Sequence, residues 1–266
     1  MRTYLPLLAA ALLLGACAGQ GESTDLRPRS VLTPQQLETT AREATDQLRD
    51  TQPLLRERET NSYVRCVADA LIRALPGDPG NWRVTVFIDN SPNAFALPGG
   101  DIGLTAGLLR VLDNQDRLAA VIAHMIAHQQ AGDISARAAE HPLPLGTPVS
   151  RETLGVLGVG PSLGTLQPFD AAQEATADQT ALQLMGRAGF NPAAAEHAWK
   201  ALQAERALAA AGNGTTPEIL TMHPADHGRL SALASVPPQA IQDFDNRRLR
   251  NQRPECGGRE PGEYTF

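Results

Sequence analysis

The sequence predicts an α+β fold that is mostly helical, with one short mixed β-sheet. Long stretches carry apolar residues at helical spacing, whereas the alternation typical of strands is confined to the region around residues 82–105. In addition, the segment DRLAAVIAHMIAHQQAGD, residues 116–133, is apolar nearly all round a helix. Such a helix is expected to be buried, so the sheet and the other helices should pack around it.

The first residues resemble an export signal. Arg2 is followed by an apolar run from Leu5 to Leu14, which is too short to span a bilayer and is typical of a secretory signal. Leu-Gly-Ala-Cys, ending at Cys17, resembles a bacterial lipobox, which implies cleavage before Cys17 and lipidation of that cysteine. The alternative is an ordinary cleaved signal with an incidental cysteine. Residue 18 is Ala rather than Asp, which favours the outer membrane, facing the periplasm.

The rest of the chain divides accordingly. We expect a signal peptide at 1–16, a tether at 17–30 rich in Gly, Pro and Ser, a single domain at 31–240, and a C-terminal tail at 241–266. The formal net charge of −6 offers no basic footprint for nucleic acid. A membrane contact is expected through the lipid anchor.

Two cysteines, Cys66 and Cys256, remain after Cys17. In an oxidising compartment they most simply form a disulfide. Such a bridge would close a very long loop and stabilise the fold by up to about 5 kcal/mol in the chain-entropy model. The alternative is two buried free thiols.

The elements of the domain follow in order. Thr33 is an expected N-cap, with Pro34 at the first helical position and Gln36 closing a capping box. A second helix is expected over residues 62–75, and LPGDPGN ends it. A strand follows at 82–88. NAFALPGGDIGLTAGLL then predicts a strand, a turn, a second strand and entry into a helix. No nucleotide-binding glycine pattern occurs.

Two histidines and two carboxylates predict a metal site. His124 and His128 are one turn apart, so both rings leave the same face of their helix. Glu174 and Asp178 have the same spacing on a later helix. Glu174 would complete a three-ligand site typical of zinc, and Asp178 could accept the outer N–H of a ligating histidine. Each pair alone has a simpler interpretation, as core histidines or as an exposed acidic face.

The motifs together resemble the M48 peptidases, especially the periplasmic and lipoprotein members. The resemblance covers about residues 60–235, and its motifs are NAFALPGGDIGLTAGLL, LAAVIAHMIAH, EATAD, AGFNP and MHPADHGRLSAL. It implies a gluzincin-like zincin fold with an active-site helix and one Zn²⁺ per chain. It also implies that His124, His128 and Glu174 are the zinc ligands, with Asp178 orienting a histidine.

The resemblance further implies how a substrate is held. Asn93, Ala94, Phe95 and Ala96 would lie along the cleft and pair with an extended peptide, because an edge strand binds main chain without reading sequence. His223 and Arg229 would approach the metal, as a gating ligand or an aid to the oxyanion; His223 could instead be a helix-start residue. The segment 140–168 is either a lid over the cleft or a mobile loop. Unfolded polypeptides and outer-membrane assembly proteins are the implied partners.

The chain departs from the family at Met125, which stands where the family has its general-base Glu. A thioether has no titratable proton. We therefore expect a catalytically impaired zinc-binding pseudopeptidase that serves outer-membrane protein quality control or assembly. The alternatives are an active zinc metalloendopeptidase with a substitute base, such as His223 or a carboxylate from the loop, and a metal-free remnant.

Overall fold

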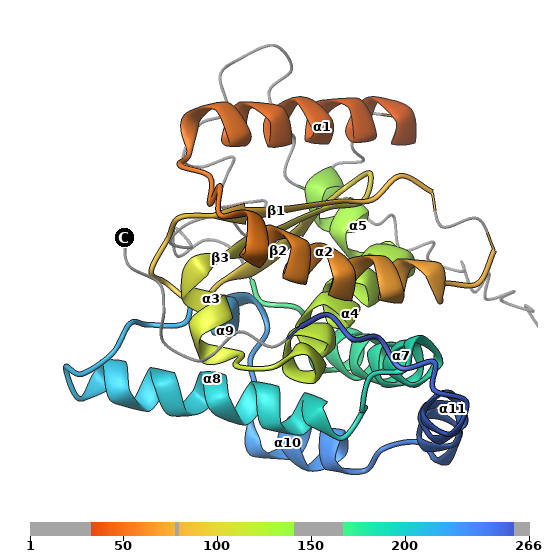
Figure 1. Ribbon diagram of the computed structural model, residues 1–266. Helices are drawn as coiled ribbons and strands as arrows, with labels where there is room; N and C mark the ends of the chain where they lie inside the picture. The colour runs from red at the N-terminus through yellow and green to blue at the C-terminus, as the bar shows by residue number, and fades with distance from the viewer. Residues whose placement is uncertain (1–32, 78–79, 141–166, 258–266) are drawn as a thin grey trace, which may run out of the picture.

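The structure is a computed structural model that describes residues 33–77, 80–140 and 167–257. Cys17, the expected signal and tether, and most of the 140–168 segment lie outside these residues. The elements are α1 (Pro34–Thr51), α2 (Arg58–Arg73), β1 (Arg83–Phe87), β2 (Ala94–Leu97), β3 (Asp101–Thr105), α3 (Ala106–Val111), α4 (Gln115–Ala131), α5 (Asp133–Glu140), α7 (Ala171–Ala188), α8 (Ala194–Ala210), α9 (Ile219–Met222), α10 (His227–Ala234) and α11 (Pro238–Leu249). The fold is thus mostly helical with a small sheet, as the sequence predicts (Figure 1).

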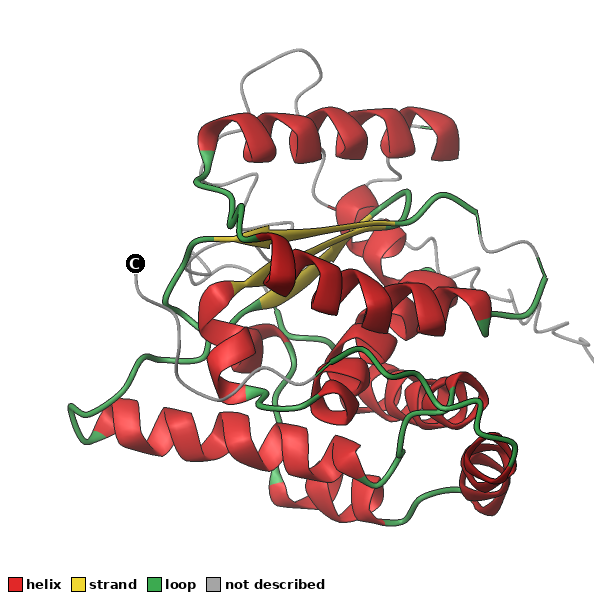
Figure 2. Ribbon diagram, in the orientation of Figure 1, coloured by secondary structure: helices red, strands yellow, loops and turns green. Residues whose placement is uncertain are grey.

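The sheet is mixed and has the order β1-β3-β2. β3 pairs in parallel with β1 and antiparallel with β2. Helix α1 covers one face, while α4 and the helices from α7 onward lie on the other, and α5 contacts both β2 and α1 (Figure 2). Both faces are buried, because Phe95 and Leu97 belong to a small apolar cluster with α1 residues, whereas Ala94 and Ala96 belong to the main core. Among the residues that the structure describes, β2 is an edge strand of this sheet.

Helix α4 is the centre of the main core. Every residue from Leu118 to His128 is buried, as the all-round apolar pattern predicts. The Asn114 side chain accepts a hydrogen bond from the Arg117 N–H and caps the start. Gly132 ends the helix in the left-handed conformation, at φ 80°, where a side chain would be strained. This turn sends the chain directly into α5.

The observed starts of α1 and α2 agree in part with the starts predicted from the sequence. The capping box at Thr33 and Gln36 is present at the start of α1. Helix α2 begins at Arg58, four residues earlier than expected, after Glu57 in extended conformation. Thr60 is fully buried on the same side as Val64 and Leu71, so the buried face extends one turn further than its apolar residues indicate.

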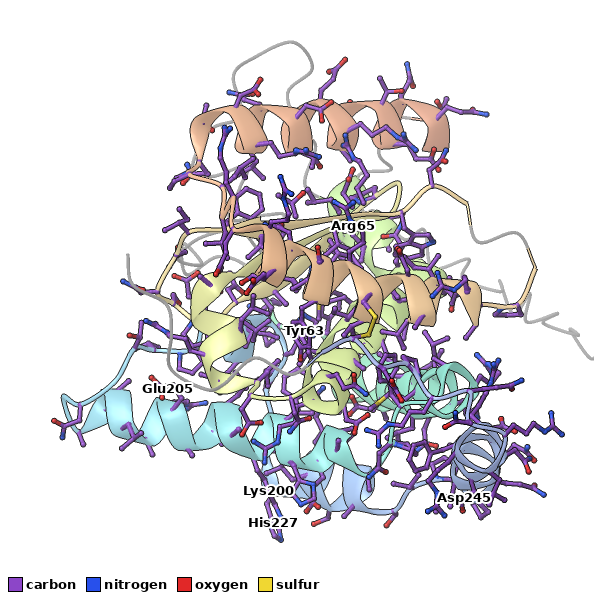
Figure 3. The ribbon with its side chains drawn as sticks, viewed as in Figure 1. Tyr63, Arg65, Lys200, Glu205, His227 and Asp245 are labelled. Atoms are coloured by element: carbon purple, nitrogen blue, oxygen red, sulfur yellow. A yellow bond between two sulfur atoms is a disulfide. The ribbon has the colours of Figure 1, made fainter. Side chains whose placement is uncertain are left out.

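The C-terminal part packs onto the domain. Cys66 and Cys256 form a disulfide that joins residues 190 positions apart, as expected (Figure 3). Gln115 Nε2 donates to the Pro254 carbonyl at 2.9 Å, which places this segment against the start of α4. Helix α11 spans the boundary that we expected between domain and tail at 240/241, and it packs against α7. Within the described residues, no helix has the length and apolar character needed to cross a bilayer.

Candidate metal centre

Four donor groups from three parts of the chain converge beside α4. His124 and His128 leave one face of α4, Glu174 lies in the first turn of α7, and His223 caps the C-terminal end of α9. One donor atom of each lies within 4.8 Å of the others. All four side chains are buried, with residue exposures of 0–3 %. The sequence-predicted trio is therefore brought together, and His223 joins it.

The separations between the donors are short. His124 Nε2 lies 3.1 Å from both His128 Nε2 and His223 Nδ1. Glu174 Oε1 lies 2.8 Å from His223 Nδ1 and 3.4 Å from His128 Nε2. Imidazole nitrogens and a carboxylate oxygen are common ligands of divalent transition metals. These four groups could hold one metal ion.

In each of the two α4 histidines, the ring nitrogen that is not directed at the donor cluster, Nδ1, faces a carboxylate. His124 Nδ1 lies 2.9 Å from Asp178 Oδ1, which is the contact predicted from the sequence. His128 Nδ1 lies 2.8 Å from Asp133 Oδ2. A metal bound through both Nε2 atoms requires the ring hydrogen of each histidine on Nδ1, beside these carboxylates, and in that form the two Nε2 lone pairs face each other. Two lone pairs 3.1 Å apart repel unless a cation or proton lies between them.

Asp133 was not predicted from the sequence. It is the first residue of α5, and the left-handed turn at Gly132 returns it to His128. Its other oxygen accepts from Gln173 Nε2 at 3.0 Å, which ties α5 to the start of α7. The sequence signal that could have identified Asp133 is a carboxylate five residues after His128 and directly after a glycine.

Arg229 binds both carboxylates of α7. Its Nε and Nη2 lie 2.8 and 2.9 Å from the two oxygens of Asp178, and Nη1 lies 2.5 Å from Glu174 Oε2. The guanidinium stacks over the Trp199 ring, with Cζ 4.0 Å from its centroid. Its Nη2 is 3.4 Å from His124 Nε2. Arg229 thus lies beside the donor cluster, where the resemblance placed it.

Burial and hydrogen bonding set the charge of the cluster. Burial alone would raise the pKa of Glu174, but hydrogen bonds from His124, His128 and His223 hold it far below its usual range. Burial lowers the pKa of His223 to about 3, against the opposing effect of Glu174. Burial also lowers the pKa of His128. Burial lowers the pKa of His124, but the carboxylates of Asp178 and Glu174 outweigh it and raise that pKa overall. An ionised Glu174 and neutral rings at His128 and His223 are the forms that bind a metal cation, whereas His124 must give up its proton to do so.

Met125 brings no titratable group to the site. Its side chain is fully buried and belongs to the main apolar core. Position 125 points about 100° around the helix from His124, so sulfur ligation is not geometrically favoured. The two carboxylates next to the donors, Asp178 and Asp133, are already paired with histidines.

The predicted substrate strand lies at the sheet edge. Asn93 O accepts from the Thr105 N–H at 3.1 Å, so in the antiparallel ladder the main-chain groups of Ala94 and Ala96 point away from β3. Asn93 Nδ2 donates to Glu218 Oε2 at 3.1 Å. Residues 93–96 are all buried, main chain included, so a peptide that pairs with this edge must first displace what covers it.

Comparisons with known proteins agree with this geometry. A family model described as peptidase family M48 matches residues 55–236. The mitochondrial metalloendopeptidase OMA1 of Schizosaccharomyces pombe is 33 % identical over 187 residues, which cover 68 % of this chain and 54 % of that protein. The β-barrel assembly-enhancing protease of Escherichia coli K12 is 28 % identical over 201 residues, covering 70 % of this chain and 40 % of that protein.

The chain spans about half the length of the curated relatives that it matches, or less. The matched region contains the four donor groups, Met125 and Arg229. Helices α1 and α11 lie outside it.

Proposed function

This chain belongs to peptidase family M48, and on that premise we propose that it is a zinc-binding pseudopeptidase. It binds unfolded or extended polypeptide and cleaves it weakly or not at all. The single observation that carries this proposal is Met125, a buried thioether at the position of the general base, beside a complete set of metal donors.

The donor set suits zinc. Around a tetrahedral Zn²⁺ with ligand bonds of 2.0–2.1 Å, neighbouring ligand atoms lie about 3.3 Å apart. Four of the separations among the donors of His124, His128, Glu174 and His223 are 2.8–3.4 Å, close to that value, and all the donor atoms lie within 4.8 Å of one another. When bound, zinc polarises a carbonyl and lowers the pKa of a water ligand. One ion per chain is the expected content.

The missing base limits catalysis. General acid–base catalysis contributes typically 10²- to 10⁴-fold, equivalent to about 3–5 kcal/mol of barrier. A thioether neither takes a proton from the attacking water nor gives one to the leaving amine. The ligands themselves are intact, so impairment at Met125 leaves metal binding unaffected.

His223 adds a second restraint. Catalytic zinc sites keep one position open for water, whereas closed four-ligand sites are structural. His223 Nδ1 is close enough to His124 Nε2 and Glu174 Oε1, at 3.1 and 2.8 Å, to fill that position. We therefore propose that His223 gates the metal and must move before water or substrate reaches it.

Polypeptide binding is assigned to the edge of β2. A strand with free main-chain groups pairs with an extended peptide without demanding a particular sequence. Ala94 and Ala96 direct theirs outward, and α4 lies against the same strand. Asn93, Ala94, Phe95 and Ala96 are accordingly the proposed peptide-binding residues.

The cellular setting is also a proposal. The lipobox-like segment ending at Cys17 supports a lipid anchor in the outer membrane, with the domain facing the periplasm. The name of the Escherichia coli relative refers to β-barrel assembly. Together these support a role in outer-membrane protein quality control or assembly, with assembly proteins as partners.

An active metalloendopeptidase with a substitute base is the alternative. His223 is the nearest candidate, but with a pKa of about 3 it is a weak base, and it points its Nδ1 at Glu174.

The two functions are separated by binding and turnover of one probe. Fluorescently labelled, reduced and carboxymethylated casein is mixed with the zinc-loaded chain. We expect saturable binding by anisotropy and an intact casein band after prolonged incubation. Efficient casein cleavage that is abolished by His128→Ala would establish the active peptidase instead. Absence of binding would overturn the polypeptide-binding role.

A further inference from the structure

A pocket lined by arginines lies away from the metal centre and is formed by residues of α2, α7 and α11 and by the positions that follow α2 and α11. Its volume is about 410 Å³. The lining residues are Arg73, Ala74, Arg187, Asp243, Asn246, Arg247 and Arg250. Four arginines and one aspartate give the wall a net charge of +3, although the chain as a whole carries −6.

The guanidinium groups of this pocket are unpaired among the described residues. None of the four has an ion pair or a side-chain hydrogen bond there, although Arg250 and Arg247 form main-chain hydrogen bonds in and after α11. Arg187 Nε is buried and has no hydrogen-bond partner. The pocket's one carboxylate, Asp243, accepts from Gln239 Nε2 at 2.8 Å. By contrast, Arg229 and Arg83 each bind two carboxylates.

Helix dipoles explain why arginines lie near the ends of these helices, but not why the arginines converge on one pocket. Arg73, Arg187 and Arg247 each lie in the last turn of a helix, where the partial negative charge favours a cation by about 0.3–1 kcal/mol. That effect stabilises each arginine singly. It does not require three helix ends to present their arginines to one concave surface.

The pocket is held rigidly. A Cβ added at Gly186 on α7 would lie 2.2 Å from the Ala240 carbonyl oxygen, so α7 and α11 approach as closely as a glycine allows. The Cys66–Cys256 disulfide joins α2 to the segment that follows α11. The helices that carry the arginines are thus pinned to one another, directly or through this bridge. A preformed set of cations loses little freedom when it binds an anion.

We propose that this pocket binds a phosphate-bearing anion. Guanidinium groups bind phosphate oxygens through two parallel N–H donors, and four of them suit a ligand with more than one charge. Such a phosphate occurs on soluble compounds and on anionic lipid headgroups. Arg187 is 13 residues after Glu174 on the same helix, or about 20 Å along its axis, so this site is separate from the metal centre.

The test uses the full chain and two kinds of probe. Tripolyphosphate is the soluble probe, and binding is followed by calorimetry and by the rise in Tm at constant ionic strength. Vesicles of phosphatidylglycerol, with phosphatidylcholine vesicles as reference, are the lipid probe, and binding is followed by co-sedimentation. Binding to tripolyphosphate alone identifies a soluble ligand, and phosphatidylglycerol-dependent binding identifies a headgroup. Either result supports the site if the variants below abolish it.

Two pocket variants are compared with one control. Arg187→Gln/Arg247→Gln and the more exposed pair Arg73→Gln/Arg250→Gln should each weaken binding at least tenfold. Arg58→Gln/Arg206→Gln removes the same charge from exposed positions elsewhere and should change binding less than twofold. Binding of neither probe, or equal weakening in the control, would overturn the proposal. If Arg187→Gln/Arg247→Gln fails to fold, Arg73→Gln/Arg250→Gln still tests the proposal.

Discussion

Replacing Met125 with glutamate should restore peptidase activity, and the size of the gain follows from the structure. The substitution places a carboxylate on α4 next to His124, on a helix whose backbone needs no change. A restored general base is worth about 10²- to 10⁴-fold in turnover. Met125 is fully buried, so the new carboxylate is desolvated. This desolvation should lower the stability of the variant by on the order of a few kcal/mol.

His223 should limit this gain. Because its Nδ1 lies 2.8 Å from Glu174 Oε1 among the donors, it competes with the water that the new base would activate. We therefore expect Met125→Glu to reach the lower part of that range and Met125→Glu/His223→Ala to exceed it by a further factor of about ten. His223→Ala alone should do little, because no base is present.

The assay is release of fluorescent peptides from labelled casein by the zinc-loaded chain, with Tm recorded for every variant. Met125→Gln is the matched control, since it has the shape of glutamate without a titratable group. Met125→Glu/His128→Ala should lose the gain, because a ligand is removed. An equal gain in Met125→Gln, or wild-type cleavage as fast as that of Met125→Glu, would refute the reasoning.

Four further results are expected. The refolded chain should hold about one zinc by elemental analysis. Glu174→Gln should lower that content sharply, because it removes a charged ligand. Wild type that holds no zinc after refolding in excess zinc would contradict this prediction. Cys17→Ser should release the protein from the membrane fraction with its Tm unchanged, and continued sedimentation after a salt wash would mean that the lipobox interpretation is wrong or that a second anchor exists. Reduction of the Cys66–Cys256 bridge should lower the free energy of unfolding in urea by up to about 5 kcal/mol, and an unchanged midpoint would show that the bridge contributes nothing. Gly186→Ala should destabilise by about 1–3 kcal/mol because its methyl group meets the Ala240 carbonyl, and a stabilised variant would mean that α11 moves freely.

Residues that act within one helical turn could be predicted from the sequence. The pair His124 and His128, and the pair Glu174 and Asp178, share a face by spacing alone, and the family motif joins the two pairs. The capping box at Thr33 is equally local. The cysteine pairing needed only the count and the expected compartment.

Residues whose role depends on how distant segments fold back could not be predicted in this way. Asp133 reaches His128 only because Gly132 adopts a left-handed conformation. His223 could have been a helix-start residue, and its place among the donors depends on how α9 is held by the segments around Pro92 and Phe169. The arginine pocket combines the ends of three helices, so no single stretch of sequence contains it.

The donor cluster also separates two roles that a metal combines in a working peptidase. His124 and His128 on α4, Glu174 on α7 and His223 after α9 would join three segments through one ion, and its binding free energy would become folding free energy. None of these ligands depends on a base at position 125. Loss of that base therefore removes chemistry while the metal can still fix α4, α7 and the β2 edge in place. On this reasoning a chelator should unfold or loosen the wild-type domain even if, as proposed, there is little activity to inhibit. Met125→Glu/His223→Ala should gain activity and lose part of that metal-dependent stability. Relative to Met125→Glu alone, the activity should rise and the metal-dependent stability should fall in the double variant only if His223 is a ligand.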